Sequence, residues 1–404
     1  MIMKLLYVTS NVSIPGTSGD ATHVMEECTA LAKQRIGKEP VEVFNITYRK
    51  KGQKNKEVIN NFTTYRIKKT KFLSPLFLFF QTFLLSLWLI LTKKIDVVYE
   101  RGKLFGGGGL LAGFLTFKKR YLEFNEPIID ALIFEGRLKK GSLKERILSF
   151  WMNWNICISN AVIGTHESIF KGIKKKHFII HWGANTEKFN PNNEKAEKTK
   201  KIKKKLKLNG ITFYYIGSFA PWHLVENIVL AGGDIVKKYP EVKFILIGKK
   251  GEKGRKVEEL IKKNKLEKNF ILIEKIPYKD VPFWTASSDA CLALFDANYP
   301  PFKKFSFFYS PIKIHEYLAS GKPVITTNIG NLKKIIKNNY NGLLVNGNDL
   351  DSLKNAMIKI IKNKKLREQL SKNARISALK TYSWDVVARK TINFFTQKNL
   401  KKGL

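Results

Sequence analysis

Short apolar runs alternate along the chain with longer segments in which apolar residues recur every three or four positions. The runs Lys4–Thr9, Val41–Ile46 and Phe62–Lys68 predict buried strands, and the period between the first two predicts a helix over Ala21–Gln34. A strand, a glycine-containing loop, a helix and a second strand, in that order, are typical of a Rossmann-like α/β unit. No GxGxxG motif follows the first strand, so the dinucleotide-binding fingerprint is not met.

The same alternation continues to the end of the chain and predicts a second Rossmann-like unit. A chain of 404 residues is expected to form two domains. We place the first domain at residues 1–185 and the second at residues 186–385. The further strands expected are Asp96–Glu100, Arg120–Phe124, Asn160–Gly164, Phe178–His181, Phe213–Ile216, Lys243–Gly248, Phe270–Ile273, Asp289–Phe295 and Val324–Thr327.

The segment Phe72–Thr92 is rich in Leu and Phe and contains no charged residue. Its length would permit a membrane-spanning helix. The strands expected before and after it should pair in one sheet, however, and a spanning helix would place them on opposite sides of a bilayer. Two alternatives remain, a helix buried against the sheet and a helix lying in the membrane interface, where the nearby lysines would favour anionic lipid.

The charge balance favours anionic partners. The 73 Lys and Arg residues against 33 Asp and Glu give a net charge of +40, which suits phosphorylated substrates, a negative membrane surface or nucleic acid. No nucleic-acid-binding motif supports the last of these. The cysteines Cys28, Cys157 and Cys291 are odd in number and far apart, which indicates reduced thiols in the cytoplasm. The N-terminal apolar run is too short for a signal peptide.

The stretch SPIKIHEYLASGKPVITT predicts a punctuated helix followed by a strand. Ser310 is the expected N-cap, Pro311 suits the first turn, and Gly321 suits a left-handed stop. A helix N-terminus favours an anion such as phosphate, and Lys313 in that turn is unfavourable unless an anion is present. Glu316 shares a face with Lys313, and its carboxylate could accept both hydroxyls of a ribose. The alternative is an amphipathic helix with a solvated Lys and Glu.

The sequence SPIKIHEYLASGKPVITTNIG, followed by NNYNGLLVNGNDLDSL, resembles the signature of the family 4 glycosyltransferases, the retaining enzymes of the GT-B fold. The resemblance implies an α/β protein of two Rossmann-like domains whose parallel sheets face a central cleft. It implies that the C-terminal domain binds a nucleotide-diphosphate sugar and that the N-terminal domain binds the acceptor. It also implies that the final helix, about residues 386–404, packs back on the first domain.

The resemblance assigns donor-side roles to particular residues. Lys313 and Glu316 are the expected catalytic pair, with Glu316 on the ribose, and the diphosphate clamp would consist of Lys313, His223 and helix-end amides. Two positions depart from the family pattern: Phe308 replaces a common Glu, and His223 replaces a common Lys. The expected donor-binding residues are Gly19, Ser218, His223, Pro277, Ser310, Pro311, Ile312, Lys313 and Glu316.

The expected acceptor side lies in the first domain, at polar residues that follow strands or begin a helix. These residues are His23, Arg101, Asn125 and Glu126. The glycines Gly106–Gly109 are interpreted as a turn or a close helix contact rather than a phosphate loop. Asp349 in the DxD match reads as an N-cap, and no metal or other cofactor is expected.

The predicted function is transfer of a hexose from a nucleotide-diphosphate sugar to a saccharide or lipid-linked acceptor, with retention, in cell-surface polysaccharide or glycolipid synthesis. The expected location is the cytoplasm or the inner face of the cell membrane. Three alternatives remain open: a basic nucleic-acid-binding protein, a GT-B nucleotide-sugar epimerase, and a weakened family member that acts as a partner subunit.

Overall fold

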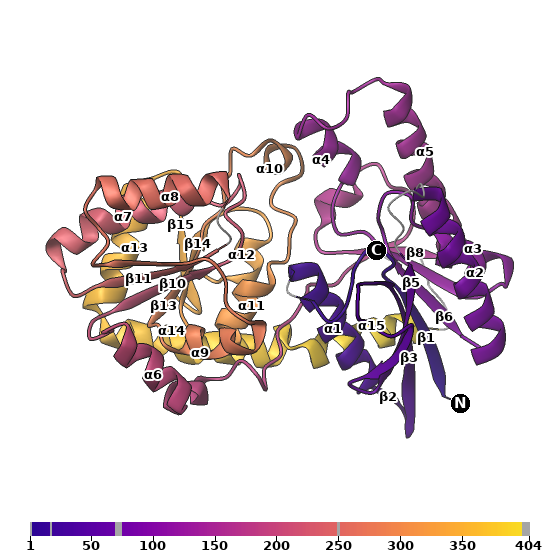
Figure 1. Cartoon of the computed structure of the whole chain (residues 1–404), viewed down its shortest axis with the longest axis horizontal. Helices are drawn as coiled ribbons and strands as arrows, with labels where there is room; N and C mark the ends of the chain where they lie inside the picture. The colour runs from indigo at the N-terminus through magenta and orange to yellow at the C-terminus, as the bar shows by residue number, and fades with distance from the viewer. Residues whose placement is uncertain (1, 17, 69–74, 249–250, 398–404) are drawn as a thin grey trace. The chain divides into compact units, whose positions relative to one another are not determined.

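The computed structural model describes residues 2–16, 18–68, 75–248 and 251–397. By its internal contacts the chain divides into two compact units (Figure 1). Unit 1 comprises residues 1–182 and 384–404, and unit 2 comprises residues 183–383. The final helix thus belongs with the N-terminal part of the chain, and the divisions fall within three residues of the boundaries expected at 185 and 385.

Unit 1 is built on a nine-stranded sheet in which β1 lies between β3 and β6, parallel to both. The strand order is β4-β5-β3-β1-β6-β7-β8-β9, with β2 paired to β3. The strands are β1 Met3–Val8, β2 Arg35–Ile36, β3 Glu39–Arg49, β4 Lys56–Ile59, β5 Phe62–Lys68, β6 Val97–Arg101, β7 Lys119–Glu123, β8 Ala161–Gly164 and β9 His177–Ile179.

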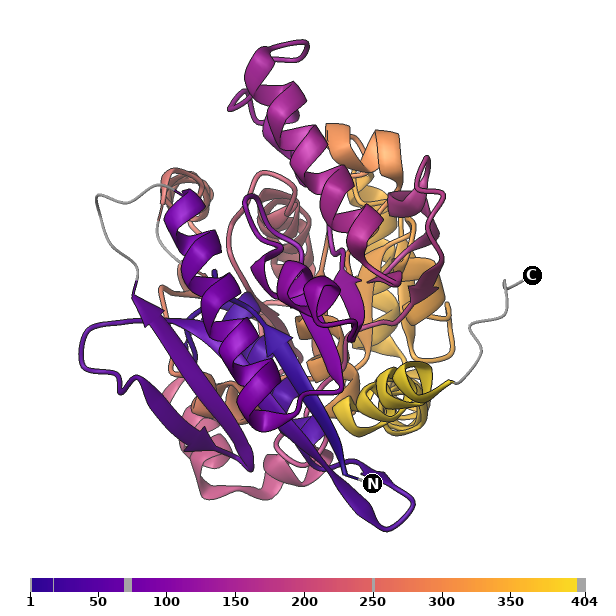
Figure 2. The ribbon, with the colours of Figure 1, turned by 90° about the vertical axis from the view of Figure 1, so that its right-hand side faces the viewer.

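Helices cover both faces of this sheet (Figure 2). One buried cluster joins the strands to α1 and α15, and the other joins them to α2 and α3. The helices of unit 1 are α1 Gly19–Ala32, α2 Pro75–Lys93, α3 Gly108–Leu115, α4 Ile128–Phe134, α5 Leu143–Ile158, the 3-10 helix η1 Glu167–Phe170 and α15 Trp384–Thr396. The first part of the predicted segment Phe72–Thr92 and the end of the predicted last helix lie outside the described residues.

The structure explains the glycine run Gly106–Gly109 by packing. The carboxylate of Glu100 accepts hydrogen bonds from the amides of Gly107 and Leu110, at 2.6 and 2.8 Å, and so occupies the N-terminus of α3. A Cβ on Gly108 would lie 2.7 Å from the carbonyl oxygen of Phe79 in α2. Close helix packing, and not a phosphate loop, accounts for these glycines.

Unit 2 contains a six-stranded parallel sheet of order β12-β11-β10-β13-β14-β15. The strands are β10 Thr212–Ile216, β11 Lys243–Ile247, β12 Phe270–Ile273, β13 Ala290–Ala293, β14 Val324–Thr327 and β15 Gly342–Val345. The helices are η2 Pro191–Lys195, α6 Glu197–Lys205, α7 Val225–Lys238, α8 Glu252–Lys263, η3 Tyr278–Asp280, α9 Val281–Ala286, α10 Pro300–Phe305, α11 Ile312–Ala319, α12 Leu332–Ile335, α13 Leu350–Lys362, α14 Lys364–Ser377 and η4 Ala378–Tyr382.

Each sheet has a switch point, where the strand order reverses its direction of growth. In unit 1 the chain builds outward from β1 through β3 to β5 and then resumes on the other side at β6. In unit 2 it builds from β10 to β12 and resumes at β13. The loops at the carboxyl ends of these strands are where open α/β sheets bind ligands. The switch points therefore locate one candidate site in each unit.

Three expectations about helix ends can be compared with the structure. Gly321 has φ +66°, in the left-handed region expected after α11. Asp349 is the N-cap of α13, and its side chain accepts from the amides of Asp351 and Ser352. The expected capping role of Ser310 is wrong: the N-cap of α11 is Pro311, and the buried Ser310 hydroxyl lies 2.9 Å from Nε2 of His315.

Candidate functional site

The switch point of unit 2 brings Lys313 over the end of β10. Its ammonium lies 4.5 Å from the ring centre of Tyr215 and 5.6 Å from that of Phe295, and Nζ is 3.5 Å from the Tyr215 hydroxyl. Gly217 follows the strand with φ +151°, and a Cβ there would lie 2.5 Å from Lys313 Nζ. Glycine at 217 therefore leaves the space into which the lysine head extends.

Lys313 is a cation without a counter-charge. Among the described residues, no carboxylate lies within ion-pair distance of its ammonium. Burial lowers the pKa of Lys313 to about 7, and the charge of Glu316 only partly opposes this shift. A desolvated ammonium of this kind gains most from an anionic ligand, which would replace its lost hydration and raise its pKa.

The loop after β10 is held by the carbonyl oxygen of Ser218. This oxygen accepts from the Tyr215 hydroxyl at 2.8 Å and from Nδ1 of His223 at 2.5 Å. Because a carbonyl can only accept, Nδ1 of His223 carries a proton. Burial, with the charge of Lys313 adding to it, holds the pKa of His223 well below its usual value. His223 is therefore neutral near pH 7 and does not supply the second positive charge that we expected.

Glu316 lies one turn further along α11 and is 5% exposed. Its Oε1 accepts a hydrogen bond from the Tyr278 hydroxyl at 2.8 Å. Tyr278 begins η3 directly after Pro277, so the Pro277 turn and the Glu316 carboxylate lie together as expected. The hydrogen bond fixes the carboxylate but also occupies one of its oxygens, a feature that the sequence did not reveal.

The N-terminus of α11 itself has no side-chain cap, because its N-cap is Pro311 and Ile312 is its first residue. The Ser310 side chain is turned into the interior, away from this role. Phe308 is buried among the rings of Phe302 and Tyr309. The amides at the start of α11 are thus left for a ligand, while the position of Phe308 offers it no polar group.

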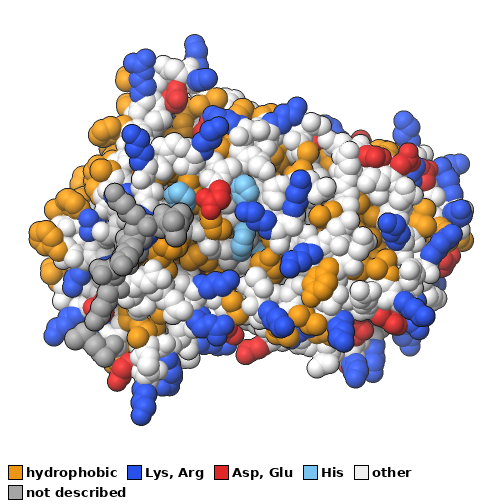
Figure 3. Space-filling model, turned by 180° about the vertical axis from the view of Figure 1, so that it is seen from behind, with side chains coloured by type: hydrophobic (Ala, Val, Ile, Leu, Met, Phe, Trp, Pro, Cys, Tyr) orange, Lys and Arg blue, Asp and Glu red, His pale blue; other side chains and the backbone are white. Residues whose placement is uncertain are grey.

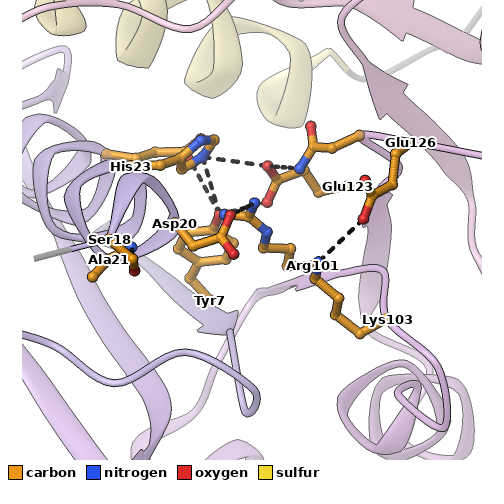
Figure 4. Close-up of polar contacts among 11 residues, drawn as sticks. Tyr7, Ser18, Asp20, Ala21, His23, Arg101, Lys103, Glu123 and Glu126 are labelled. Atoms are coloured by element: carbon orange, nitrogen blue, oxygen red, sulfur yellow. Dashed lines mark hydrogen bonds and ion pairs between the residues drawn. The ribbon is translucent and has the colours of Figure 1, made fainter. Parts of the chain in front are cut away.

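The switch point of unit 1 holds a buried polar cluster (Figure 4). Nε2 of His23 lies 2.6 Å from Glu27 Oε2 and 3.3 Å from Glu123 Oε1. The Tyr7 hydroxyl lies 2.9 Å from Glu27 and 2.5 Å from Glu123, and it has one proton to donate between them. His23 comes from α1, Tyr7 from β1 and Glu123 from β7, so the three strand and helix ends meet here.

The protonation states in this cluster follow from burial. Burial lowers the pKa of His23 to about 4, although the charge of Glu123 acts to raise it. Burial raises the pKa of Glu27 to about 7, against the hydrogen bond from Tyr7 and the charge of Arg101. Near neutral pH the imidazole is neutral and Glu27 is partly protonated, so its carboxyl group can donate to His23 Nε2. The cluster can therefore hold and pass on a proton.

The other expected acceptor-side residues surround this cluster. Nδ2 of Asn125 donates to Glu123 at 2.5 Å, and Lys103 lies 3.4 Å from Glu126. Arg101 Nη2 donates to Asp20 Oδ1 at 2.6 Å. Several of their buried polar atoms have no hydrogen-bond partner among the described residues: His23 Nδ1, Arg101 Nε, Arg101 Nη1 and Asn125 Oδ1. These atoms could bind the hydroxyl groups of a ligand.

Gly19 is the first residue of α1, after the N-cap Ser18. A Cβ at Gly19 would meet no atom within 4 Å, so packing within the described part of unit 1 does not require glycine here. The space beside this helix end is open to a ligand.

One group could hold a metal ion. The ligand atoms of His23, Glu27 and Glu123 lie within 4.8 Å of one another. In the structure these atoms share hydrogen bonds with one another and with Tyr7, and Arg101 places a positive charge nearby. These contacts describe a proton-sharing cluster and compete with a cation for the same oxygens.

Sequence reasoning missed Tyr7, Glu27, Glu123, Tyr215 and Tyr278 as members of these sites. Glu27 is at i+4 from His23, and this spacing on one helix face could have indicated the pair. The strand residues Tyr7 and Glu123 come together only through the sheet, across 116 positions of sequence. Their contact has no local signal.

Comparison with known proteins adds family and fold. Residues 196–377 match the model of the glycosyl transferases group 1 family. An uncharacterized glycosyltransferase of Methanocaldococcus jannaschii is 30% identical over 178 residues, which are 42% of this chain and 44% of that protein. Spore coat protein SA of Bacillus subtilis is 23% identical over 60% of this chain and 64% of its own length. The chain spans about half the length of the curated relatives it matches.

Solved structures resemble the whole chain. Sucrose-phosphate synthase of Thermosynechococcus elongatus has a TM-score of 0.72 at 15% identity and covers 98% of both chains. HepE of Anabaena, solved with UDP and glucose, has a TM-score of 0.72 at 14% identity and covers 98% of this chain and all of its own. At these identities the likeness concerns the fold, and it confirms the predicted GT-B class with two Rossmann-like domains.

Proposed function

Residues 196–377 are a glycosyl transferases group 1 domain, and from this premise we propose that the protein transfers a sugar from a nucleotide-diphosphate sugar to an acceptor. The observation that carries the proposal is the uncompensated ammonium of Lys313 beside the uncapped start of α11. A helix N-terminus and a cation together suit a diphosphate. HepE, which shares the fold, was solved with UDP-glucose.

The leaving diphosphate is the place where negative charge grows during transfer. Lys313 and the amides of Pro311–Ile312 would stabilise this charge, and such preorganised donors lower the barrier. Glu316 would bind the ribose, with its carboxylate held in place by Tyr278. We propose that this suffices without a divalent cation and that the sugar, a hexose, keeps its anomeric configuration.

The acceptor is proposed to bind in unit 1. The unpartnered atoms of His23, Arg101 and Asn125 are donors and acceptors that suit saccharide hydroxyls. The cluster of His23 and Glu27 could take up the proton that the attacking hydroxyl loses. The three cysteines are free, which fits a reducing cytoplasmic location. A cell-surface polysaccharide or glycolipid is the proposed product.

The first experiment measures binding of UDP, GDP, ADP and dTDP by calorimetry from pH 6 to pH 9. Because the pKa of Lys313 is about 7 in the free protein, binding above pH 7 must take up a proton. The dissociation constant of the bound diphosphate should therefore rise with pH, by up to about tenfold per unit above pH 7. Lys313→Met should bind weakly and lose this pH dependence.

The matched control is Lys237→Ala, which removes an exposed lysine of the same unit whose partner is Asp234. It should bind as the wild type does. No binding of any of the four diphosphates, or the same pH profile in wild type and Lys313→Met, would contradict the proposal. Retention is tested separately, by NMR of the anomeric proton of the product once a donor is known.

A further inference from the structure

The outward face of α2 in unit 1 is apolar along its whole length. Its outward side chains are spaced by three or four positions and so form one stripe. They and their exposed fractions are Phe77 39%, Phe80 56%, Leu84 61%, Trp88 49% and Leu91 64%. Figure 2 shows α2 in front of the strands of unit 1, with no other element over it.

The inward face of α2 has the opposite character. Thr82 and Ser86 are fully buried, and the Thr82 hydroxyl donates to the carbonyl of Leu78 in its own helix. Gly108 of α3 lies so close that a Cβ there would be 2.8 Å from the amide of Phe83. Small and weakly polar residues thus allow close helix packing, and the large apolar residues point outward. This polarity is the reverse of that of a helix that faces water.

A second apolar stripe lies on the neighbouring helix α5. Leu143, Ile147 and Phe150 follow the same spacing and are 74%, 50% and 72% exposed. The two helices contact each other through Phe79 of α2 and Trp151 of α5, whose ring centres are 5.1 Å apart. We call the two stripes together the α2–α5 face. Figure 3 shows hydrophobic side chains exposed over the surface of unit 1, with Lys and Arg among them.

Basic residues flank both stripes. Lys139, Lys140, Lys144 and Arg146 are exposed at the start of α5, and Lys94 is exposed just after α2. The one acidic residue at the start of α5, Glu145, is engaged there by the amide of Gly141. An apolar stripe bordered by cations complements a surface with an acyl interior and anionic headgroups.

A membrane-spanning role for α2 does not fit the topology. Of the helices among the described residues, only Pro75–Lys93 is long and apolar enough to cross a membrane. The strands before and after it, β5 and β6, belong to one sheet, as the sequence led us to expect. The helix must therefore enter and leave on the same side of a bilayer.

We propose that the α2–α5 face is a docking surface on which the protein lies in the headgroup region of an anionic lipid bilayer. The apolar stripes enter the boundary between headgroups and acyl chains, and the flanking lysines contact lipid phosphates. The proposal does not depend on the glycosyltransferase activity, because no residue of the two switch-point sites belongs to this face.

The test uses the full-length protein in flotation with vesicles of phosphatidylcholine alone and of phosphatidylcholine with 30% phosphatidylglycerol. The wild type should float with the anionic vesicles, at least tenfold more than with the neutral ones, and less at high salt. The triple variant Phe80→Ser, Leu84→Ser, Trp88→Ser should lose most of this binding, at least tenfold. These side chains are exposed, so unit 1 should keep its fold.

Two controls match the variants. Lys139→Glu, Lys140→Glu, Lys144→Glu should lose anionic-vesicle binding, whereas the same charge change on α6 of unit 2, Lys200→Glu, Lys201→Glu, Lys204→Glu, should lose much less. Brominated lipid should quench the wild type more than Trp88→Phe, which reports insertion of this ring. Leu230→Ser, an exposed apolar residue of α7, should bind like the wild type.

Other occupants of the face give distinct results. If the wild type is a dimer that the serine variant dissociates, and no vesicle binding is seen, the face is an interface between copies and the proposal is overturned. Equal vesicle binding by wild type and serine variant overturns it as well. Diphosphate binding by the serine variant should be unchanged, so failure here is separate from failure of the proposed enzymatic function.

Discussion

The two switch points solve the problem of buried charge in opposite ways. In unit 1, Arg101 pairs with Asp20, Lys103 with Glu126, and His23 lies between two carboxyl groups. In unit 2, Lys313 has aromatic rings and a hydroxyl around it but no carboxylate within ion-pair distance among the described residues. A site whose charges are already neutralised suits a neutral ligand rich in hydroxyls. A site with a surplus cation suits an anion.

The largest effect is expected for removal of that surplus cation. Lys313→Ala should lower kcat by about 100-fold or more, because the charge that grows on the leaving diphosphate loses its preorganised donor. Steady-state kinetics with the donor identified by calorimetry measures this. Lys237→Ala is the control in the same unit, and a kcat within threefold of wild type in Lys313→Ala would remove the contrast between the two switch points.

A smaller effect is expected at the ribose carboxylate. Glu316→Gln should raise the KM for the donor about tenfold or more, because a hydrogen bond to a charged acceptor is lost. Tyr278→Phe keeps the ring but removes the hydroxyl that holds Glu316 Oε1, and it should raise KM by about threefold. The control Tyr340→Phe alters an exposed tyrosine. Equal effects in the Tyr278 and Tyr340 variants would show that the hydrogen bond does not position Glu316.

The elements around these sites were predictable where burial acts on a continuous segment. β14 Val324–Thr327 and β5 Phe62–Lys68 begin and end at the predicted residues, because buried parallel strands are continuous apolar runs. Gly321 was predictable because few other residues adopt its left-handed conformation. These features depend on local sequence alone.

The polar contacts were predictable only in part. Lys313 and Glu316 share a helix face by spacing, and this was evident from the sequence. Ser310 failed as a cap because His315, five residues on, binds its hydroxyl in the interior. The neutral state of His223 depends on burial and on the Ser218 carbonyl, and the Tyr7–Glu123 contact depends on the sheet. Such features arise from tertiary packing and have no sequence period.

The proton-sharing cluster of unit 1 predicts a pH effect on stability. In the native state the pKa of Glu27 is about 7, against an ordinary value of 4.5, so between these values the folded protein retains a proton that the unfolded chain releases. The contribution of Glu27 to stability therefore falls as the pH rises from 4.5 to 7. Glu27→Gln stays neutral throughout. Its stability relative to wild type should rise over this window, by about 3 kcal/mol at most.

Urea unfolding of both proteins at pH 5, 6, 7 and 8 checks this sign. His23, with its pKa lowered to about 4, adds a slope of the opposite sign, but it does so in both proteins and largely cancels in the difference. Glu39→Gln, at an exposed position of the same unit, should show no such trend. A stability difference for Glu27→Gln that is constant with pH would mean that Glu27 is ionised in the folded protein.

The smallest effect is expected for metal removal. If Lys313 and the helix end neutralise the diphosphate, and the His23 cluster works by sharing protons, dialysis against EDTA should change kcat/KM by less than twofold. Added Mg²⁺ or Mn²⁺ should change it no further. A loss of activity that either ion restores would reverse the comparison, because unit 1 would then contain the unfilled site. The variant His23→Ala would locate that ion: if the trio of His23, Glu27 and Glu123 holds it, restoration by metal should be lost.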